Sequence, residues 1–119
     1  MKTFTTAVYA VFGVLAIAAG LVAWVMPAVA LPAGEVTPLT SHLTRELSSA
    51  FVFIGLMFFW CIGHYEQRQP VHIAFLVFIA LFAGVHWYDY LGDRRDVMSP
   101  LLNSIPVALL AITAPFKQR

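Results

Sequence analysis

Charged residues are scarce in this sequence, cysteine occurs once, and there is no tract of low complexity and no internal repeat. The single cysteine, Cys61, excludes an intrachain disulfide. Seven basic and six acidic residues give a net charge of only +1, so we expect no nucleic acid among the partners. A soluble domain of 119 residues could not bury a composition that is 61% hydrophobic and 11% charged. The sequence therefore predicts a protein whose solvent is lipid.

Four apolar segments predict an all-α fold, a four-helix transmembrane bundle that forms one domain over residues 1–119. A span needs about 20 residues. The last segment is shorter and contains Pro106, so we expect it to tilt or to be shielded by its neighbours. The first segment is longer than the apolar core of a signal peptide, and we interpret it as a retained helix. The helices are expected near residues 5–31, 38–64, 70–91 and 100–116.

Three prolines mark expected helix starts. Thr37-Pro38 and Ser99-Pro100 each join a capping residue to a proline at the first helical position. Pro70 is expected to open the third helix in the same way.

Basic residues divide unequally between the two sides of the membrane that four spans define. Cytoplasmic loops carry an excess of Lys and Arg. We therefore expect the N and C termini to be cytoplasmic. The terminal side holds Lys2, Arg68, Lys117 and Arg119, and the other side holds Arg45, Arg94 and Arg95.

Ionisable and polar side chains gather near the predicted outer ends of three helices. If the third helix ends near Leu91, His86 lies about 7 Å inside that end. Intramembrane ionisable residues usually face the bundle interior and pair with one another. The sequence therefore predicts a partly buried polar pocket in the outer leaflet, formed by Arg45, Glu46, His86, Asp89, Tyr90 and Asn103.

Three interpretations of this pocket remain open at this point. The residues can be headgroup-level charges and structural hydrogen bonds between helices. They can instead bind a lipid headgroup or a quinone, with Arg45 on an anionic or carbonyl oxygen and His86 or Tyr90 as a hydrogen-bonding partner. The third interpretation is chemical: a metal bound by imidazole and carboxylate ligands, or acid–base chemistry on a lipophilic substrate. The metal ligands would be His42, Glu46, His86 and Asp89.

Two further features carry structural expectations. His64 and His72 flank the inner turn HYEQRQPVH, and we expect both to be solvated turn residues. The pairs Ala16–Gly20 and Ala80–Gly84 have the small-xxx-small spacing that permits close helix contacts.

The predicted helices have four features in common with a known family: a long first helix, a proline-containing loop, Arg45 at the head of the second helix, and a glycine-containing third helix before the dipeptide GD. In these features the chain resembles the DoxX-like small four-helix bacterial inner-membrane proteins. The resemblance implies a bacterial inner (plasma) membrane and an association with membrane redox or lipid chemistry. The chain departs from the pattern where Ser48 and Ser49 replace glycines and His86 replaces arginine. The stretch HLTRE, residues 42–46, also resembles the His/Glu pair of sterol-isomerase-type four-helix bundles.

These observations favour a non-catalytic function. We expect an accessory or structural subunit of a larger membrane complex, which binds a lipid or quinone in the outer-leaflet pocket. Its partners would be membrane lipids and either other membrane protein subunits or further copies of the chain. The alternative is a membrane-embedded enzyme or metal-binding protein that uses His86 with Glu46 and Asp89.

Overall fold

The computed structural model describes residues 1–32, 34–93 and 97–115, and these residues form four α-helices and two short 3-10 turns. No strand occurs among them, so the predicted all-α fold class is confirmed. The elements are α1 (Lys2–Val25), η1 (Pro27–Val29), α2 (Pro38–Gly63), η2 (Tyr65–Gln67), α3 (Gln69–Asp93) and α4 (Met98–Ile112).

Three of these helices, α1, α2 and α3, are long and apolar enough to cross a membrane, which indicates an integral membrane protein. α4 is a shorter apolar helix of 15 residues that continues through Pro106. The orientation of the termini stays a prediction. Of the basic residues behind it, Arg94, Arg95, Lys117 and Arg119 lie outside the described residues.

α2 begins as the sequence predicts. The Thr37 hydroxyl accepts a hydrogen bond of 3.1 Å from the backbone N–H of Thr40, three residues on. The Thr40 hydroxyl in turn accepts one of 2.8 Å from the backbone N–H of Thr37. Pro38 occupies the first helical position. This reciprocal cap satisfies donors that no carbonyl within the helix can reach.

The boundaries of α1 and α4 differ from those expected. α1 ends at Val25 instead of near residue 31, because Pro27 disfavours the helical conformation for Met26, whose φ and ψ are −126° and 71°. α4 begins at Met98 and ends at Ile112, where a helix over 100–116 was expected. The predicted cap at Ser99 is wrong: the residue before the helix is Val97, and it makes no side-chain cap.

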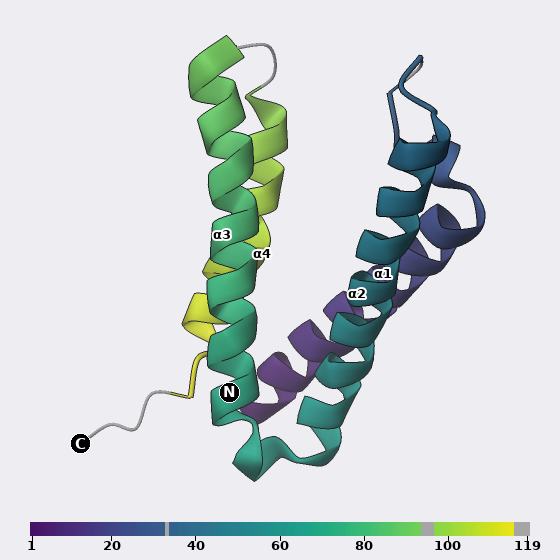
Figure 1. Cartoon of the computed structure of the whole chain (residues 1–119). Coiled ribbons are helices and arrows are strands. Elements are labelled where there is room, and N and C mark those ends of the chain that lie inside the picture. The colour runs from purple at the N-terminus through teal and green to yellow at the C-terminus, as the bar shows by residue number, and fades with distance from the viewer. Residues whose placement is uncertain (33, 94–96, 116–119) are drawn as a thin grey trace. The chain divides into compact units, whose positions relative to one another are not determined.

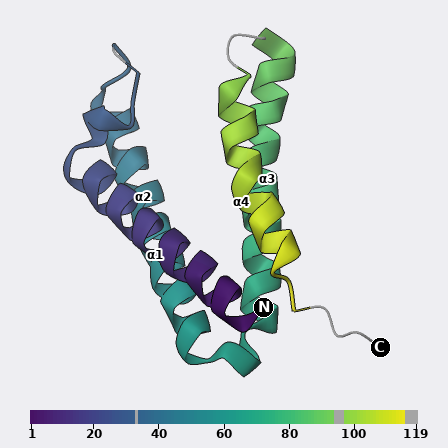
Figure 2. The same cartoon turned by 180° about the vertical axis from the view of Figure 1, so that it is seen from behind.

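The chain forms two compact units, and the first comprises Tyr9–Gly63, which is most of α1 and all of α2. The two helices lie side by side (Figure 2). Their backbones touch at glycines: a Cβ atom on Gly20 would lie 2.8 Å from the Ser48 carbonyl oxygen, and one on Gly55 would lie 2.8 Å from the Gly13 carbonyl oxygen. The close contact expected at Gly20 is therefore confirmed.

The second unit comprises Met1–Val8 and His64–Arg119, in which α3 and α4 run antiparallel (Figure 1). Its buried side chains include Phe75, Ala83 and Leu110. Within this unit Ala80 is exposed and a Cβ on Gly84 would meet no atom within 4 Å, so the close helix contact expected at this pair stays a prediction.

Candidate functional site

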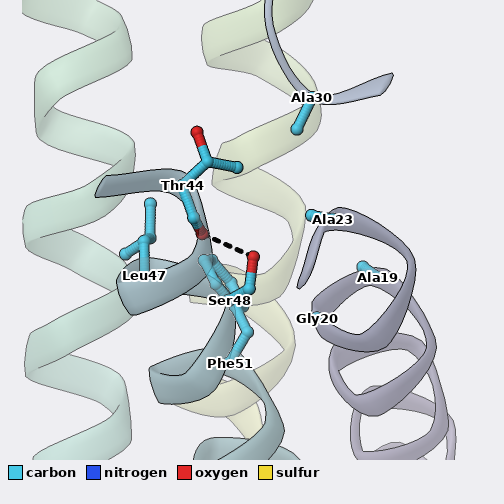
Figure 3. A pocket seen from close by; sticks show the side chains of 8 residues that line it. All are labelled: Ala19, Gly20, Ala23, Ala30, Thr44, Leu47, Ser48 and Phe51. Atoms are coloured by element: carbon cyan, nitrogen blue, oxygen red, sulfur yellow. Dashed lines mark hydrogen bonds between the residues drawn. The ribbon is translucent and has the colours of Figure 1, made fainter. Parts of the chain in front are cut away.

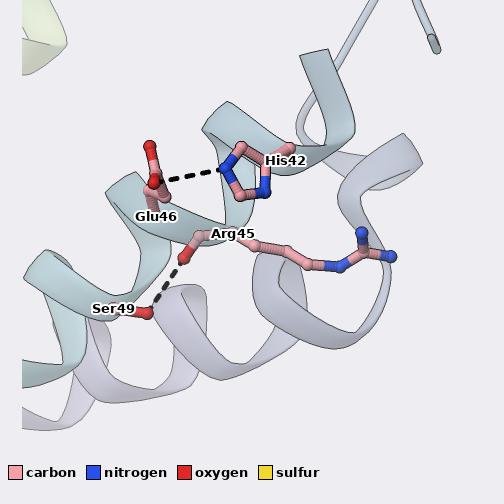
Figure 4. Close-up of polar contacts among 4 residues, drawn as sticks. All are labelled: His42, Arg45, Glu46 and Ser49. Atoms are coloured by element: carbon pink, nitrogen blue, oxygen red, sulfur yellow. Dashed lines mark hydrogen bonds and ion pairs between the residues drawn. The ribbon is translucent and has the colours of Figure 1, made fainter. Parts of the chain in front are cut away.

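In the first unit, Arg45 ties the start of α2 to the end of α1. Its Nε donates a hydrogen bond of 3.3 Å to the carbonyl oxygen of Trp24, in the last turn of α1. Carbonyls at that position have no partner within the helix, and a cation there complements the helix dipole. The guanidinium points away from His42 and Glu46 (Figure 4). Arg45 therefore clamps two helices and does not join the neighbouring ionisable pair.

His42 and Glu46 do form the predicted i, i+4 pair, with His42 Nε2 3.3 Å from Glu46 Oε1 (Figure 4). Both side chains are well exposed, at 67% and 63%. An exposed pair on one helix turn contributes at most a few tenths of a kcal/mol. Its two donor atoms alone do not complete a metal coordination shell.

An open pocket of about 210 Å³ lies between α1 and α2 (Figure 3). Its only side-chain oxygens already donate to the helix backbone: Ser48 Oγ to the Thr44 carbonyl at 2.6 Å, and Thr44 Oγ1 to the Thr40 carbonyl at 2.8 Å. Pockets for drug-sized ligands hold roughly 300–1,000 Å³, so this one suits a segment of an apolar chain. The lining residues are Ala19, Gly20, Ala23, Ala30, Thr44, Leu47, Ser48 and Phe51.

In the second unit, Ser99 forms hydrogen bonds with two of the predicted site residues, His86 and Asn103. Its hydroxyl lies 3.0 Å from His86 Nδ1 in a hydrogen bond that joins α4 to α3. Its carbonyl accepts a hydrogen bond of 2.8 Å from Asn103 Nδ2. The His86 ring also packs edge-on against Phe82, with ring centroids 5.1 Å apart. These contacts hold the His86 ring in a defined orientation, with Nε2 as the nitrogen left for any ligand.

The remaining predicted residues of this unit have different surroundings. Tyr90 packs edge-on against Trp87 at 6.0 Å, and Trp87 Nε1 donates to Ser104 Oγ at 2.9 Å. Asp89 is exposed, and no ion pair links it to another described residue. Trp87 therefore docks α4 through Ser104, whereas Tyr90 packs within α3 and Asp89 is exposed in this unit.

The predicted pocket and metal site each combine residues of both units, and both stay predictions. Within either unit, the residues that the structure describes include no group of three or more His, Cys, Asp or Glu side chains able to hold a metal ion. The proposed ligands divide equally: His42 and Glu46 belong to the first unit, and His86 and Asp89 to the second.

His72 corrects the expectation of a solvated inner turn. The residue is 0% exposed, and its Nε2 lies 2.9 Å from the carbonyl oxygen of Leu110. Because a carbonyl only accepts, Nε2 carries the proton and donates. The carbonyl belongs to the last turn of α4, so His72 on α3 caps the C-terminal end of its neighbour. His64 is exposed, as expected.

Sequence reasoning did not find the hydroxyl partners Ser99 and Ser104. A usable signal was present, since Ser99, Asn103 and Ser104 are the polar residues of an apolar segment, and Ser99 and Asn103 are one helical turn apart. No protein-family model matches the chain, and neither the curated proteins nor the solved structures include a significant match to it.

Proposed function

We propose that this protein is a non-catalytic accessory subunit of a larger assembly in a bacterial inner membrane, and that it binds the tail of a lipid or quinone between α1 and α2. One observation carries this proposal: a pocket with apolar walls lies between α1 and α2, and the residue after its lining Thr44 is a cation. The hydroxyls of Thr44 and Ser48 are satisfied by backbone carbonyls, so the pocket offers apolar contact to a ligand. Arg45 follows Thr44 directly and has terminal nitrogens available for a headgroup or carbonyl oxygen.

The polar residues of the second unit support a structural role. His86 and Trp87 on α3 form hydrogen bonds with Ser99 and Ser104 on α4, as residues that dock helices in a membrane do. The subunit role is supported by large apolar side chains that stay exposed on every long helix, such as Leu15, Phe53 and Leu81. In a bilayer such surfaces face lipid or a partner. The proposal also agrees with the DoxX-like resemblance.

The lipophile is tested by filling the pocket. Ala23→Phe places a ring in it, whereas Ala18→Phe puts the same ring on an exposed position of α1 outside the lining. After purification in mild detergent, mass spectrometry of extracted small molecules should find a lipophile with wild type and Ala18→Phe and lose it with Ala23→Phe. If the two variants retain equal amounts of the lipophile, the ligand does not bind in this pocket.

The subunit role is tested separately by co-purification. Solubilised membranes should yield the chain together with other membrane proteins, or as a homo-oligomer, on size exclusion with mass spectrometry. A monodisperse monomer that retains a lipophile would contradict the subunit role and leave the binding role standing.

The alternative, a membrane-embedded enzyme or metal-binding protein, is favoured by the 3.3 Å approach of His42 to Glu46. Its test is metal content. Stoichiometric zinc, iron or manganese in the purified wild type, lost in both His42→Ala and Glu46→Gln, would favour the alternative over the accessory role.

A further inference from the structure

Two cations meet at one aromatic ring in the second unit, and none of these three residues takes part in the proposed function. The Arg68 guanidinium lies over the Tyr65 ring, with Cζ 3.5 Å from the ring centroid. Lys2 Nζ lies over the same ring at 5.1 Å. Both distances fall within the range of about 6 Å for cation–π contacts. Residues 63 positions apart in the chain thus form one basic cluster, Lys2–Tyr65–Arg68.

The charge of this cluster is not compensated by an acid. Among the described residues, no carboxylate lies within ion-pair distance of Lys2 or Arg68, and Glu66 is exposed and pairs with neither. Arg68 Nη1 donates to the Tyr65 carbonyl at 2.6 Å, which fixes the guanidinium. Its Nε is buried without a hydrogen-bond partner. Bringing two cations together without an acid is unfavourable unless an anion joins them.

The position of the cluster identifies the kind of anion. The candidate membrane span of α1 begins at Lys2, and that of α3 begins at Gln69, directly after Arg68. The cluster therefore lies where two membrane spans start, at the level of lipid headgroups. Tyrosine is enriched at this level, and basic residues there attract anionic lipids. His72 does not compete for the anion with its Nε2, which donates to the Leu110 carbonyl.

We propose that Lys2, Tyr65 and Arg68 form a binding site for a phosphate group, supplied by the headgroup of an anionic phospholipid. Lys2 and Arg68 supply the positive charge, and the guanidinium adds directed N–H donors to the phosphate oxygens. The Tyr65 ring holds the two side chains at one place. The site gives the protein a preference for anionic over zwitterionic lipid, which is independent of a lipophile between α1 and α2.

The test uses native mass spectrometry of the full chain in detergent with phosphatidylglycerol or phosphatidylcholine of identical acyl chains. Wild type should retain phosphatidylglycerol preferentially. Each juxtamembrane cation strengthens binding of an anionic lipid about fivefold, so Lys2→Gln with Arg68→Gln should weaken phosphatidylglycerol binding about 25-fold and weaken phosphatidylcholine binding much less. Glu66→Gln is the matched control on a neighbouring exposed residue and should keep the preference.

A charge-preserving variant distinguishes the loss of positive charge from misfolding. Lys2→Arg with Arg68→Lys should keep most of the preference, while circular dichroism and size exclusion verify folding of every variant. Equal retention of the two lipids by wild type, or an undiminished preference in the double Gln variant, would overturn the proposal. A folded charge-preserving variant that binds as weakly as the double Gln variant would also overturn it. Displacement of the lipid by millimolar inorganic phosphate would support the phosphate site and assign free phosphate as its ligand.

Discussion

Gly55 brings the backbone of α2 against the backbone of α1, and the variant Gly55→Ala tests whether that contact holds the first unit together. The new Cβ would lie 2.5 Å from Ile17 Cγ1, 2.8 Å from the Gly13 carbonyl oxygen and 3.1 Å from the Ile17 nitrogen. Two of these atoms belong to a helix backbone and cannot rotate away. The helices must therefore separate along their contact, and the variant should be less stable.

The magnitude follows from two opposing effects. Overpacking a close contact costs about 1–3 kcal/mol. Alanine is favoured over glycine within a helix by about 1 kcal/mol, which offsets part of that cost. Gly84→Ala is the matched control, because position 84 is also helical and its Cβ would meet no atom within 4 Å. The difference between the two variants isolates the packing cost and should be about 1–3 kcal/mol in favour of Gly84→Ala.

The measurement is reversible unfolding in mixed micelles as the fraction of denaturing detergent rises, followed by far-ultraviolet circular dichroism. The free energy of unfolding should fall for Gly55→Ala relative to Gly84→Ala. If both variants unfold at the same detergent fraction, the backbone contact between α1 and α2 does not exist in the membrane-like environment, and the pocket that depends on it loses its basis.

Three further predictions concern single hydrogen bonds. Thr37→Ala removes the cap of α2 and should lower stability by about 1 kcal/mol, with faster amide exchange confined to the first turn of α2; uniform exchange would contradict it. Ser99→Ala should change the nitrogen-15 shift of His86 Nδ1 and cost about 1 kcal/mol, and an unchanged shift would show that the bond is absent. His72→Phe removes one of two side-chain donors to the buried Leu110 carbonyl, the other being the Thr113 hydroxyl at 3.2 Å, and should lower the free energy of unfolding by about 1 kcal/mol; wild-type stability would refute that role.

Features that depend on local chemistry could be predicted from the sequence. The Thr37-Pro38 cap is decided by residues within one turn, and the structure confirms it. Ser99-Pro100 has the same local signature, yet the Ser99 hydroxyl bonds His86 on another helix and the helix starts two residues before Pro100. A tertiary partner outweighed the cap there, and no short stretch of sequence contains that partner.

Packing between distant segments was the part that the sequence did not reveal. Gly20 was expected at a helix contact, but its partner Ser48 follows only from the register of α2 against α1. His72 was expected in solvent because it flanks the inner turn, whereas it is fully buried and its Nε2 bonds the Leu110 carbonyl on α4. Within the candidate site, the i, i+4 pair of His42 and Glu46 was predictable from helical spacing alone.

The unequal lengths of α3 and α4 bear on the membrane that suits this protein. At about 1.5 Å per residue, the 25 residues of α3 extend about 37 Å and the 15 residues of α4 extend about 22 Å. The hydrocarbon core of a typical bilayer is about 30 Å thick. If α4 crosses the membrane beside α3, acyl chains next to α4 must compress, and we then expect the antiparallel pair to thin the bilayer on one flank and to favour regions of short-chain lipid.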